Sequence, residues 1–360
     1  MRDRKEPLPR GATIGILGGG QLARMLAMAA ARLGLNIHVY SPVADCPAAP
    51  VAGRITVADY EDTEALIAFA KTCHVVTYEF ENVPSITAKT AASQSILRPR
   101  ARALDVAQDR LREKTFLRET VGVPVAPFVD IASIHDLRRG VAHVGLPCVL
   151  KTRRFGYDGK GQVILRAGDD LDAAYAALGG SGNAYGLILE GFINFSREVS
   201  IVAARGANGT VAAYPLTENV HHNHILHSST APAQNDDGTA AAMATRILNE
   251  LDYIGVIGVE FFQLSTGELI VNEIAPRVHN SGHWTQNAGC TDQFEQHIRA
   301  VASWPLGDPQ PTYAMRMTNL IGDEVEDAAA LASEPGAHLH LYGKREARMG
   351  RKMGHINRRL

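Results

Sequence analysis

The segment from residue 151 to residue 162 constrains the fold more than any other part of the chain. It reads Lys-Thr-Arg-Arg-Phe-Gly-Tyr-Asp-Gly-Lys-Gly-Gln, and short β-prone runs at residues 147–150 and 163–165 flank it. Its glycines let the backbone approach an anion closely and point N–H groups at it. The spacing does not match a Walker A loop, and no helix start follows. We therefore predict a hairpin lid over a nucleotide triphosphate, with a plain flexible β-turn as the alternative.

The chain has 360 residues, more than one hydrophobic core usually organises, so two or three domains are expected. A net charge of -2 gives no reason to expect nucleic acid as a partner. The four cysteines are scattered without a Cys-x-x-Cys pair, which argues against a disulfide framework and fits a reducing cytoplasm. Residues 1–10 lack the apolar run of a signal peptide, and no stretch reaches transmembrane length. We expect a cytoplasmic protein without a membrane partner.

Residues 13–23 predict a strand, a glycine turn and the start of a helix, and a second strand at 37–40 completes a βαβ unit. The glycines and Ala23 formally satisfy the dinucleotide fingerprint. An NAD site needs an acidic residue after the second strand, whereas Ser41 stands there. A nicotinamide cofactor is therefore disfavoured. The glycines either permit tight strand-to-helix packing or bind another phosphate or ribose, and the sequence leaves both open.

The strand-helix alternation continues through predicted strands at residues 54–57 and 75–78, with a helix at 63–70 between them. Glu79 and Glu81 follow the last of these strands. Ligands of open parallel sheets bind at the carboxyl ends of the strands, so both carboxylates are candidate ligand-binding groups.

Near residue 98 the alternation stops, and a charged helix is predicted from 103 to 121. The region beyond it has an α+β pattern. Strands are predicted at residues 187–190, 197–202, 211–214, 258–262 and 269–274, and a helix at 239–251.

Glu260 and Glu273 form the clearest pair in that region. Residues 265–268 indicate a four-residue hairpin turn, and pairing Leu264 with Leu269 sets the two glutamates opposite each other, with Cβ atoms about 5 Å apart. A loop one residue shorter would instead pair Glu260 with Asn272. Two carboxylates this close repel unless a cation lies between them, and oxygen ligands favour Mg²⁺. The alternative is a solvated hairpin face.

Two further segments are rich in histidine. Residues 219–227 contain four histidines, but no carboxylate or cysteine completes a zinc site, so we predict a polar loop with one histidine near a phosphate. Residues 275–286 place Arg277 and His279 directly after Glu273 in a glycine-containing segment, a mixture typical of anion and sugar binding. The alternative for this segment is an ordinary polar surface loop.

These motifs closely resemble the ATP-grasp ligases and, within them, the N5-carboxyaminoimidazole ribonucleotide synthetases of purine biosynthesis. The resemblance is carried by residues 15–22, 78–83, 156–162, 194–200, 272–285 and 350–355. It implies a mixed α/β and α+β protein with an ATP-grasp fold. A Rossmann-like pre-ATP-grasp domain would span residues 11–102, the ATP-grasp region 103–305 with its lid at about 125–195, and a C-terminal segment 306–360.

The resemblance implies that ATP cleavage drives the carboxylation of 5-aminoimidazole ribonucleotide by bicarbonate, via carboxyphosphate. The products would be N5-carboxyaminoimidazole ribonucleotide, ADP and phosphate. The enzyme would be a cytoplasmic homodimer that acts in the pathway to inosine monophosphate. Formate-dependent glycinamide ribonucleotide transformylase shares the glycine turn, but the His-Asn-Ser-Gly-His-Trp run argues against it. Ser41 disfavours an NAD-linked oxidoreductase, and the paired glutamates and two loop lysines disfavour a non-catalytic nucleotide sensor.

The resemblance also implies roles for individual residues. The ATP ligands would be Arg110, Lys151, Gly156, Tyr157, Asp158, Gly159, Lys160, Gly161, Gln162, Glu190, Gly191, Phe192, Ile193, Glu198, His221, Asn272 and Glu273. Mg²⁺ would be held by Glu260 and Glu273. The ribonucleotide ligands would be Gly20, Gln21, Leu22, Ser41, Glu79, Tyr157, Asp158, Arg277, His279, Lys344 and Arg351, the cations holding its phosphate. The catalytic groups would be Lys151, Tyr157, Asp158 and Arg277.

Overall fold

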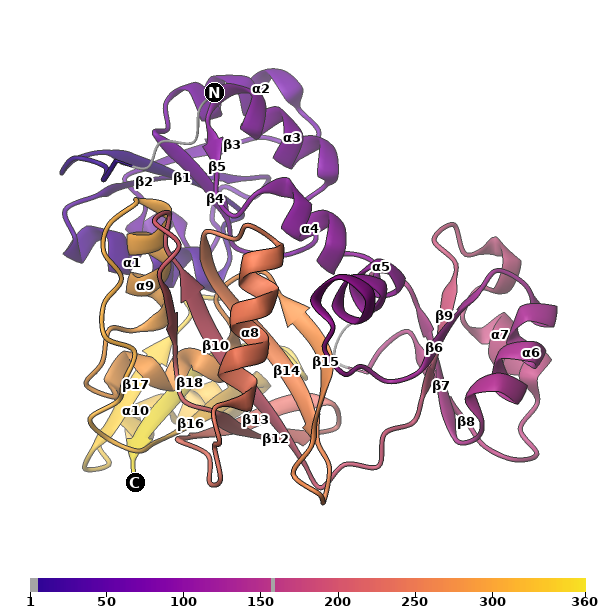
Figure 1. Ribbon diagram of the computed structural model, residues 1–360. Coiled ribbons are helices and arrows are strands. Elements are labelled where there is room, and N and C mark those ends of the chain that lie inside the picture. The colour runs from indigo at the N-terminus through magenta and orange to yellow at the C-terminus, as the bar shows by residue number, and fades with distance from the viewer. Residues whose placement is uncertain (1–5, 157–158) are drawn as a thin grey trace.

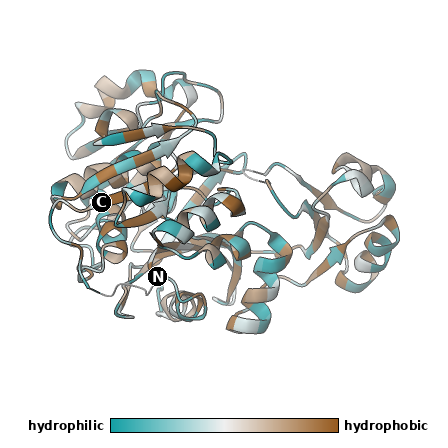
Figure 2. Cartoon of the chain, turned by 90° about the horizontal axis from the view of Figure 1, so that it is seen from above, coloured by the Kyte–Doolittle hydropathy of each residue, from teal (hydrophilic) through white to brown (hydrophobic). Residues whose placement is uncertain are grey.

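The computed structural model describes residues 6–156 and 159–360, and arranges the described chain around three β-sheets (Figure 1). A five-stranded sheet comes first in the chain, a four-stranded sheet follows, and a nine-stranded sheet takes up the remainder. The four-stranded sheet and its helices project away from the other two sheets in Figures 1 and 2. The predicted hairpin lid is part of this projecting unit.

The five-stranded sheet is parallel, with the strand order β3-β2-β1-β4-β5. Its strands are β1 (Thr13–Leu17), β2 (Asn36–Ser41), β3 (Arg54–Val57), β4 (Val75–Tyr78) and β5 (Ile96–Leu97). Its helices are α1 (Gln21–Arg32), α2 (Thr63–Lys71) and α3 (Ser85–Gln94), and a short 3₁₀ turn covers Ala49–Val51. The structure confirms the predicted strand-helix alternation, because buried apolar strands between amphipathic helices leave a clear local pattern.

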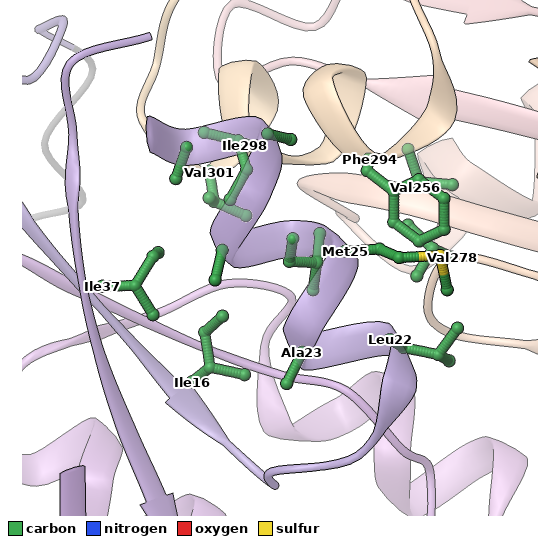
Figure 3. Close-up of a cluster of buried hydrophobic side chains, with 14 of the residues drawn as sticks. Ile16, Leu22, Ala23, Met25, Ile37, Val256, Val278, Phe294, Ile298 and Val301 are labelled. Carbon is green, nitrogen blue, oxygen red and sulfur yellow. The ribbon is translucent and has the colours of Figure 1, made fainter. Parts of the chain in front are cut away.

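Helix α1 joins the five-stranded sheet to the rest of the molecule because both of its sides are buried. Figure 3 shows Ala23 near Ile16 of β1, while Met25 lies toward Phe294 of helix α9 (Gln293–Val301). Val256 of the nine-stranded sheet belongs to the same buried cluster. The two sheets therefore share one core. Burying apolar side chains of this size contributes about 1.5–3 kcal/mol each to its stability.

The helix predicted from residue 103 to residue 121 is interrupted, so that prediction is wrong in one respect. The structure has α4 (Ala101–Ala107), then α5 (Arg110–Thr115), which continues into a π-helical turn (Phe116–Val121). The Asp109 carboxylate accepts hydrogen bonds from the N–H groups of Leu111 and Arg112, at 3.0 and 3.2 Å, and so caps α5. A side chain that satisfies the free N–H groups of a new helix start competes with continuation of the previous helix.

The four-stranded sheet has the order β6-β9-β7-β8 and is antiparallel throughout. Its strands are β6 (Phe128–Ile131), β7 (Cys148–Thr152), β8 (Gln162–Leu165) and β9 (Leu187–Gly191). Helices α6 (Ile134–Val144) and α7 (Leu171–Ala177) pack with these strands around a separate core, and a 3₁₀ turn spans Gly180–Gly182. The glycine-rich segment connects β7 to β8, as the hairpin prediction requires.

The nine-stranded sheet runs β15-β14-β10-β12-β13-β16-β18-β17, with β11 beside β10. Its strands are β10 (Arg197–Arg205), β11 (Val211–Ala213), β12 (Thr217–His222), β13 (Ile225–Ala231), β14 (Gly255–Gln263), β15 (Leu269–Ala275), β16 (Met315–Ile321), β17 (Ala337–Leu341) and β18 (Lys352–Arg359). The remaining helical segments are α8 (Thr239–Glu250), α10 (Ala328–Ala332) and 3₁₀ helices at Asn280–Asn287 and Gly322–Asp327. The last three strands thus extend the sheet formed by the middle of the chain.

The histidine-rich segment is part of this sheet, so the predicted polar loop is wrong. Strands β12 and β13 form a hairpin through it, with Asn223 and His224 at the turn. Both turn residues have positive φ, 49° and 65°, as a tight two-residue hairpin turn requires. A strand with many polar residues on an exposed face cannot be told from a polar loop by its sequence alone.

The Glu260–Glu273 pairing is confirmed, although the predicted route to it is wrong. Gln263 pairs with Leu269, one residue off the predicted register. A β-bulge then places Asn272 as an extra residue in β15 and restores the register, so Glu260 lies opposite Glu273. Bulges of this kind redirect side chains and are common beside functional sites.

No helix in the described part of the chain combines the length and apolar character needed to cross a bilayer. Figure 2 agrees, because hydrophilic and hydrophobic residues are interspersed along the helices.

Candidate active site

A buried cluster of charges connects the four-stranded sheet to helix α5 and strand β15. Lys151 Nζ on β7 donates to Glu190 Oε2 on β9 at 3.0 Å. Lys114 Nζ on α5 lies 3.5 Å from the same oxygen and donates to the backbone oxygen of Asn272 at 2.7 Å. Although burial opposes ionisation of Glu190, the two ammonium groups hold its pKa at about 2. Lys114 was not a predicted site residue, since it is one of several charged residues in its helix.

Glu190 retains an unused acceptor. Its Oε1 atom is buried and has no hydrogen-bond partner among the described residues, whereas Oε2 receives the lysines. A buried carboxylate oxygen without a donor is uncommon in folded proteins, and it is compatible with a ligand that supplies an N–H group. Glu190 and Gly191 end strand β9, and the predicted ligands Phe192 and Ile193 follow directly.

Arg110 links the nucleotide loop to the predicted metal pair. Its Nη1 donates to Glu273 Oε2 at 3.1 Å, and its Nη2 donates to the Gly156 oxygen at 3.2 Å. Glu260 has a different partner, because His279 Nε2 lies 3.1 Å from its Oε1. Burial opposes ionisation of Glu260, yet His279 holds its pKa at about 2. Each carboxylate therefore has its own partner, and their mutual repulsion is already relieved without a metal.

The structure forms no cluster of three or more His, Cys, Asp and Glu side chains poised to bind a metal among the residues it describes. The predicted ATP ligand His221 pairs through Nδ1 with the carboxylate of Glu198. Burial lowers the affinity of this imidazole for a proton, but the hydrogen bond to Glu198 and the negative charges of Glu198 and Glu260 together outweigh burial and raise the pKa of His221. The pair orients Glu198 on β10 beside the end of the β12–β13 hairpin.

The glycine-rich loop shows why its glycines are needed. Gly159 and Gly161 both have positive φ, 75° and 71°. A Cβ on Gly159 would lie 2.5 Å from the ring of His224, and one on Gly161 would lie 2.6 Å from Thr152 Oγ1. Gln162 begins β8, opposite Lys151. Of the other predicted loop residues, Gly156 and Lys160 are described, while Tyr157 and Asp158 lie outside the described residues.

A cavity of about 500 Å³ lies between the carboxyl end of the five-stranded sheet and residues 343–351. Five predicted ribonucleotide ligands line it: Gly20, Ser41, Glu79, Lys344 and Arg351. Sequence reasoning missed other lining residues, namely Asp45, Cys46, Tyr60, Arg345 and Glu346. They had no motif to mark them, and only the fold brings them to the cavity.

Glu79 decides the role of the first glycine turn. Its carboxylate accepts hydrogen bonds from the N–H groups of Gly20 and Ala23, the latter at 2.9 Å, and so caps the N-terminus of α1. A Cβ on Gly20 would lie 2.7 Å from Glu79 Oε1. Burial raises the pKa of Glu79 despite these hydrogen bonds. The glycines therefore admit a carboxylate of this chain, at the position where a dinucleotide-binding protein would hold pyrophosphate.

Two of the predicted ligands that line this cavity are cations. Lys344 Nζ donates to the Lys352 oxygen at 2.6 Å, and Arg351 donates to the Glu346 oxygen at 3.1 Å. Burial, together with the charges of Arg351 and Lys352, lowers the pKa of Lys344 to about 8. The cavity thus holds positive charge near a partly desolvated carboxylate, an arrangement suited to a small anionic ligand with a polar head.

Four predicted ribonucleotide ligands do not line this cavity: Gln21, Leu22, Arg277 and His279. Leu22 belongs to the core shown in Figure 3. Arg277 pairs with Glu81 through both Nε and Nη2, the latter at 3.1 Å, while Glu273 and Glu260 also act on its charge. Arg277 therefore bonds to the turn that follows β4 and also interacts with the charges of the carboxylate pair.

Three family models match successive parts of the chain. A ribonucleotide synthetase preATP-grasp domain matches residues 11–108, an ATP-grasp domain 116–294, and a phosphoribosylaminoimidazole carboxylase C-terminal domain 316–359. Over 359 residues the chain is 50% identical to the N5-carboxyaminoimidazole ribonucleotide synthase of Brucella melitensis, and the match covers 98% of both chains. The chain belongs to the N5-carboxyaminoimidazole ribonucleotide synthase family. These matches confirm the expected ATP-grasp fold with its N-terminal and C-terminal domains.

Crystal structures of N5-carboxyaminoimidazole ribonucleotide synthases have the same fold. An ADP complex of such an enzyme matches with a TM-score of 0.92 and 40% identity, over 98% of this chain and 94% of that one. The Aspergillus clavatus enzyme in complex with ADP and 5-aminoimidazole ribonucleotide matches with a TM-score of 0.88 and 30% identity, over 98% and 94%.

In this synthase, only part of the segment 275–286 agrees with the predicted ligand-binding loop. Its second half is a buried 3₁₀ helix, and Trp284 is fully buried with its Nε1 donating to Thr217 Oγ1 at 3.1 Å. In the same core, His283 Nδ1 accepts a hydrogen bond from the Gln293 side-chain amide at 2.9 Å. Only the first half, with Arg277 and His279, reaches the charged site. The Trp and His content that suggested function belongs largely to packing.

Proposed function

We propose that this protein uses ATP to carboxylate 5-aminoimidazole ribonucleotide with bicarbonate in purine biosynthesis. The products are N5-carboxyaminoimidazole ribonucleotide, ADP and phosphate. Two features of this synthase-family chain together carry the proposal. One is the Lys151–Glu190 pair on the strands next to the glycine-rich hairpin, and the other is the cationic cavity at the carboxyl end of the parallel sheet. One part suits a nucleoside triphosphate and the other a small sugar phosphate.

The nucleotide is held by groups on three elements. Lys151 and Arg110 neutralise phosphate oxygens, and the N–H groups of the glycine-rich loop donate to them. The unused Glu190 Oε1 accepts from the adenine amino group, which supplies the donor that the buried oxygen lacks. The Glu198 carboxylate, oriented by His221, accepts from the ribose hydroxyls. Tyr157 and Asp158 remain proposed ligands in the same loop.

Two steps follow from this arrangement. An oxygen of bicarbonate attacks the γ-phosphorus of ATP, the bond to ADP breaks, and carboxyphosphate forms. The exocyclic amine of the ribonucleotide then bonds to the carboxyl carbon, phosphate leaves, and the amine loses a proton. Arg277 lies near both carboxylate groups and the turn after β4, so it is the proposed cation for the bicarbonate and carboxyphosphate oxygens.

Mg²⁺ would be held by Glu260 and Glu273, and it would neutralise charge on the ATP phosphates. The donor set fits a hard cation, because two carboxylates from paired strand positions share one face of the hairpin. In the structure Arg110 forms an ion pair with Glu273, and His279 lies within hydrogen-bonding distance of Glu260.

Lys344 and Arg351 hold the ribonucleotide phosphate, while Ser41 and Glu79 offer acceptors to its other polar groups. Arg277 and His279 approach the amine and the carboxyl group that is transferred to it. We further propose three regions for the chain, at residues 11–102, 103–305 and 306–360, a cytoplasmic location and a homodimer. Sedimentation velocity of the purified protein tests the homodimer.

Purified protein mixed with ATP, Mg²⁺, ¹³C-bicarbonate and 5-aminoimidazole ribonucleotide tests the activity. We expect ADP release to depend on each component, and the label to appear in an acid-labile carbamate of the ribonucleotide. Formate in place of bicarbonate is the control for the related transformylase reaction. Equal ADP release without the ribonucleotide, or activity with formate alone, would overturn the proposal.

A further inference from the structure

The break between α4 and α5 binds the base of the glycine-rich loop. We call Gln108, Asp109 and Arg110 the junction. Arg153, two residues after Lys151, makes two parallel hydrogen bonds to the Asp109 carboxylate, at 3.1 and 2.6 Å. Its backbone oxygen accepts from the Arg110 N–H at 2.9 Å. Paired guanidinium–carboxylate contacts have one favourable orientation, so they fix the base of the loop relative to the junction.

Gln108 extends this connection to a different part of the molecule. Its side-chain oxygen accepts from Arg154 Nη2 at 2.8 Å, on the loop side. Its amide nitrogen donates to the backbone oxygens of Glu81 and Val83, both at 2.7 Å. The side chain is almost fully buried, with 7% of its surface exposed. Rotating the amide would place its NH₂ group against the Arg154 guanidinium and its oxygen against the two carbonyls, so one orientation is strongly favoured.

The turn that Gln108 holds carries ribonucleotide-site residues. It follows β4 and begins with Glu79, which lines the cationic cavity. Glu81 in the same turn pairs with Arg277. A continuous chain of hydrogen bonds therefore runs from Arg154 through Gln108 to the residues around the second substrate.

We propose that Gln108 is a positioning residue that couples nucleotide binding at the glycine-rich loop to ribonucleotide binding at the turn after β4. The inference rests on the proposed function, because it assigns the two substrates to these two sites. When ATP binds against the base of the loop, the amide of Gln108 favours the turn geometry in which Glu79 lines the ribonucleotide cavity and Glu81 pairs with Arg277. Coupling of this kind is reciprocal, so the ribonucleotide tightens ATP binding by the same factor.

Calorimetric titration of the ribonucleotide, with and without a non-hydrolysable ATP analogue and Mg²⁺, measures the coupling. For the parent protein we expect the analogue to tighten ribonucleotide binding about fivefold or more, within the range of ordinary coupled sites. Gln108→Met removes both sets of hydrogen bonds while keeping the volume. We expect each ligand alone to bind within about twofold of the parent value, and the coupling factor to fall close to one.

Two further variants keep the test decisive if Gln108→Met unfolds. Gln108→Glu retains the acceptor for Arg154 but loses the donors to Glu81 and Val83. Arg154→Met removes the contact to Gln108 and the stacking of Arg154 on Phe155 and Tyr185, and it leaves the contacts of Gln108 with the turn in place. Both should lower the coupling factor and kcat more than they change the KM for ATP. The matched control is Gln94→Met, since the Gln94 amide donates to the neighbouring Ser93 on α3 and should leave coupling unchanged.

The outcomes separate this inference from the proposed function. A parent protein that neither binds the ribonucleotide nor releases ADP in its presence would refute the function. A parent protein that is active but shows no coupling, or variants that keep the parental factor, would refute the role of Gln108 and leave the function standing.

Discussion

Replacing Lys114 by methionine tests the buried charge cluster most directly. Lys114 is 1% exposed, and its ammonium contacts Glu190 and donates to the backbone oxygens of Asn272 and Val271, at 2.7 and 3.4 Å. Methionine keeps most of the side-chain volume and removes the charge and the donors. Lys151 remains beside Glu190, so the carboxylate keeps one partner at 3.0 Å.

The expected loss can be worked from the Glu190 carboxyl group. Its pKa is about 2 instead of 4.5, and one pKa unit corresponds to about 1.36 kcal/mol, so its ionised form contributes about 3 kcal/mol to stability. Lys114 supplies the largest of the favourable charge interactions and Lys151 and Arg110 supply the others, so removing Lys114 forfeits only part of this value. The two carbonyls left without their donor add about 1–2 kcal/mol. We expect Lys114→Met to lower the free energy of unfolding by about 2–4 kcal/mol at pH 7.

The pH dependence follows from the sign of the shift. A lowered carboxyl pKa stabilises the fold above the unfolded value near 4.5, and this contribution disappears as pH falls toward 2. The difference between variant and parent should therefore be constant from pH 7 to about 5 and shrink below that. Urea unfolding followed by Trp284 and Trp304 fluorescence measures it, with Lys89→Met on the exposed side of α3 as the control. A loss no larger than that of the control, or one unchanged at pH 3.5, would refute the reasoning.

Four further predictions concern activity. Lys151→Ala should lower kcat/KM for ATP by at least about tenfold, since charge-assisted contacts contribute about 1.5–3 kcal/mol, and unchanged ATP kinetics would contradict the assignment. Glu260→Gln and Glu273→Gln should strongly lower turnover while changing Tm little, and excess Mg²⁺ should partly restore turnover. Variants that are less stable without metal but fully active with it would contradict the metal assignment. Arg351→Ala should raise the KM for the ribonucleotide but not for ATP, and equal losses with the dephosphorylated nucleoside would show that Arg351 does not hold the phosphate. Burial lowers the pKa of Lys344 to about 8, so the side chain loses its charge as the pH rises through that value. The KM for the ribonucleotide should therefore rise between pH 7 and 9, and Lys344→Arg should abolish the rise. A KM that does not change with pH in the parent protein would exclude this role.

Much of the fold could be predicted because its signals are local. The strands at Thr13–Leu17 and Val75–Tyr78, the helices on either side and the glycine-rich hairpin all follow from periodicity and turn chemistry within about ten residues. The Glu260–Glu273 pairing was predicted from a hairpin register one residue away from the observed one, and it holds because a bulge compensates for the difference. The bulge at Asn272 was not predicted, because it depends on the packing of strands β14 and β15 and their neighbours.

Tertiary structure alone decided how the site is assembled. Lys114 and Gln108 looked like ordinary residues of a charged helix. They gained their roles from contacts with Glu190, Asn272 and Glu81, which are all distant from them in the sequence. The Glu79 carboxylate occupies the helix terminus that the glycine turn suggested for a phosphate. The sequence determined which segments form strands, helices and turns, because those depend on neighbouring residues. The fold determined which charges meet, because burial makes an ion pair or hydrogen bond strong only when distant segments exclude water from it together.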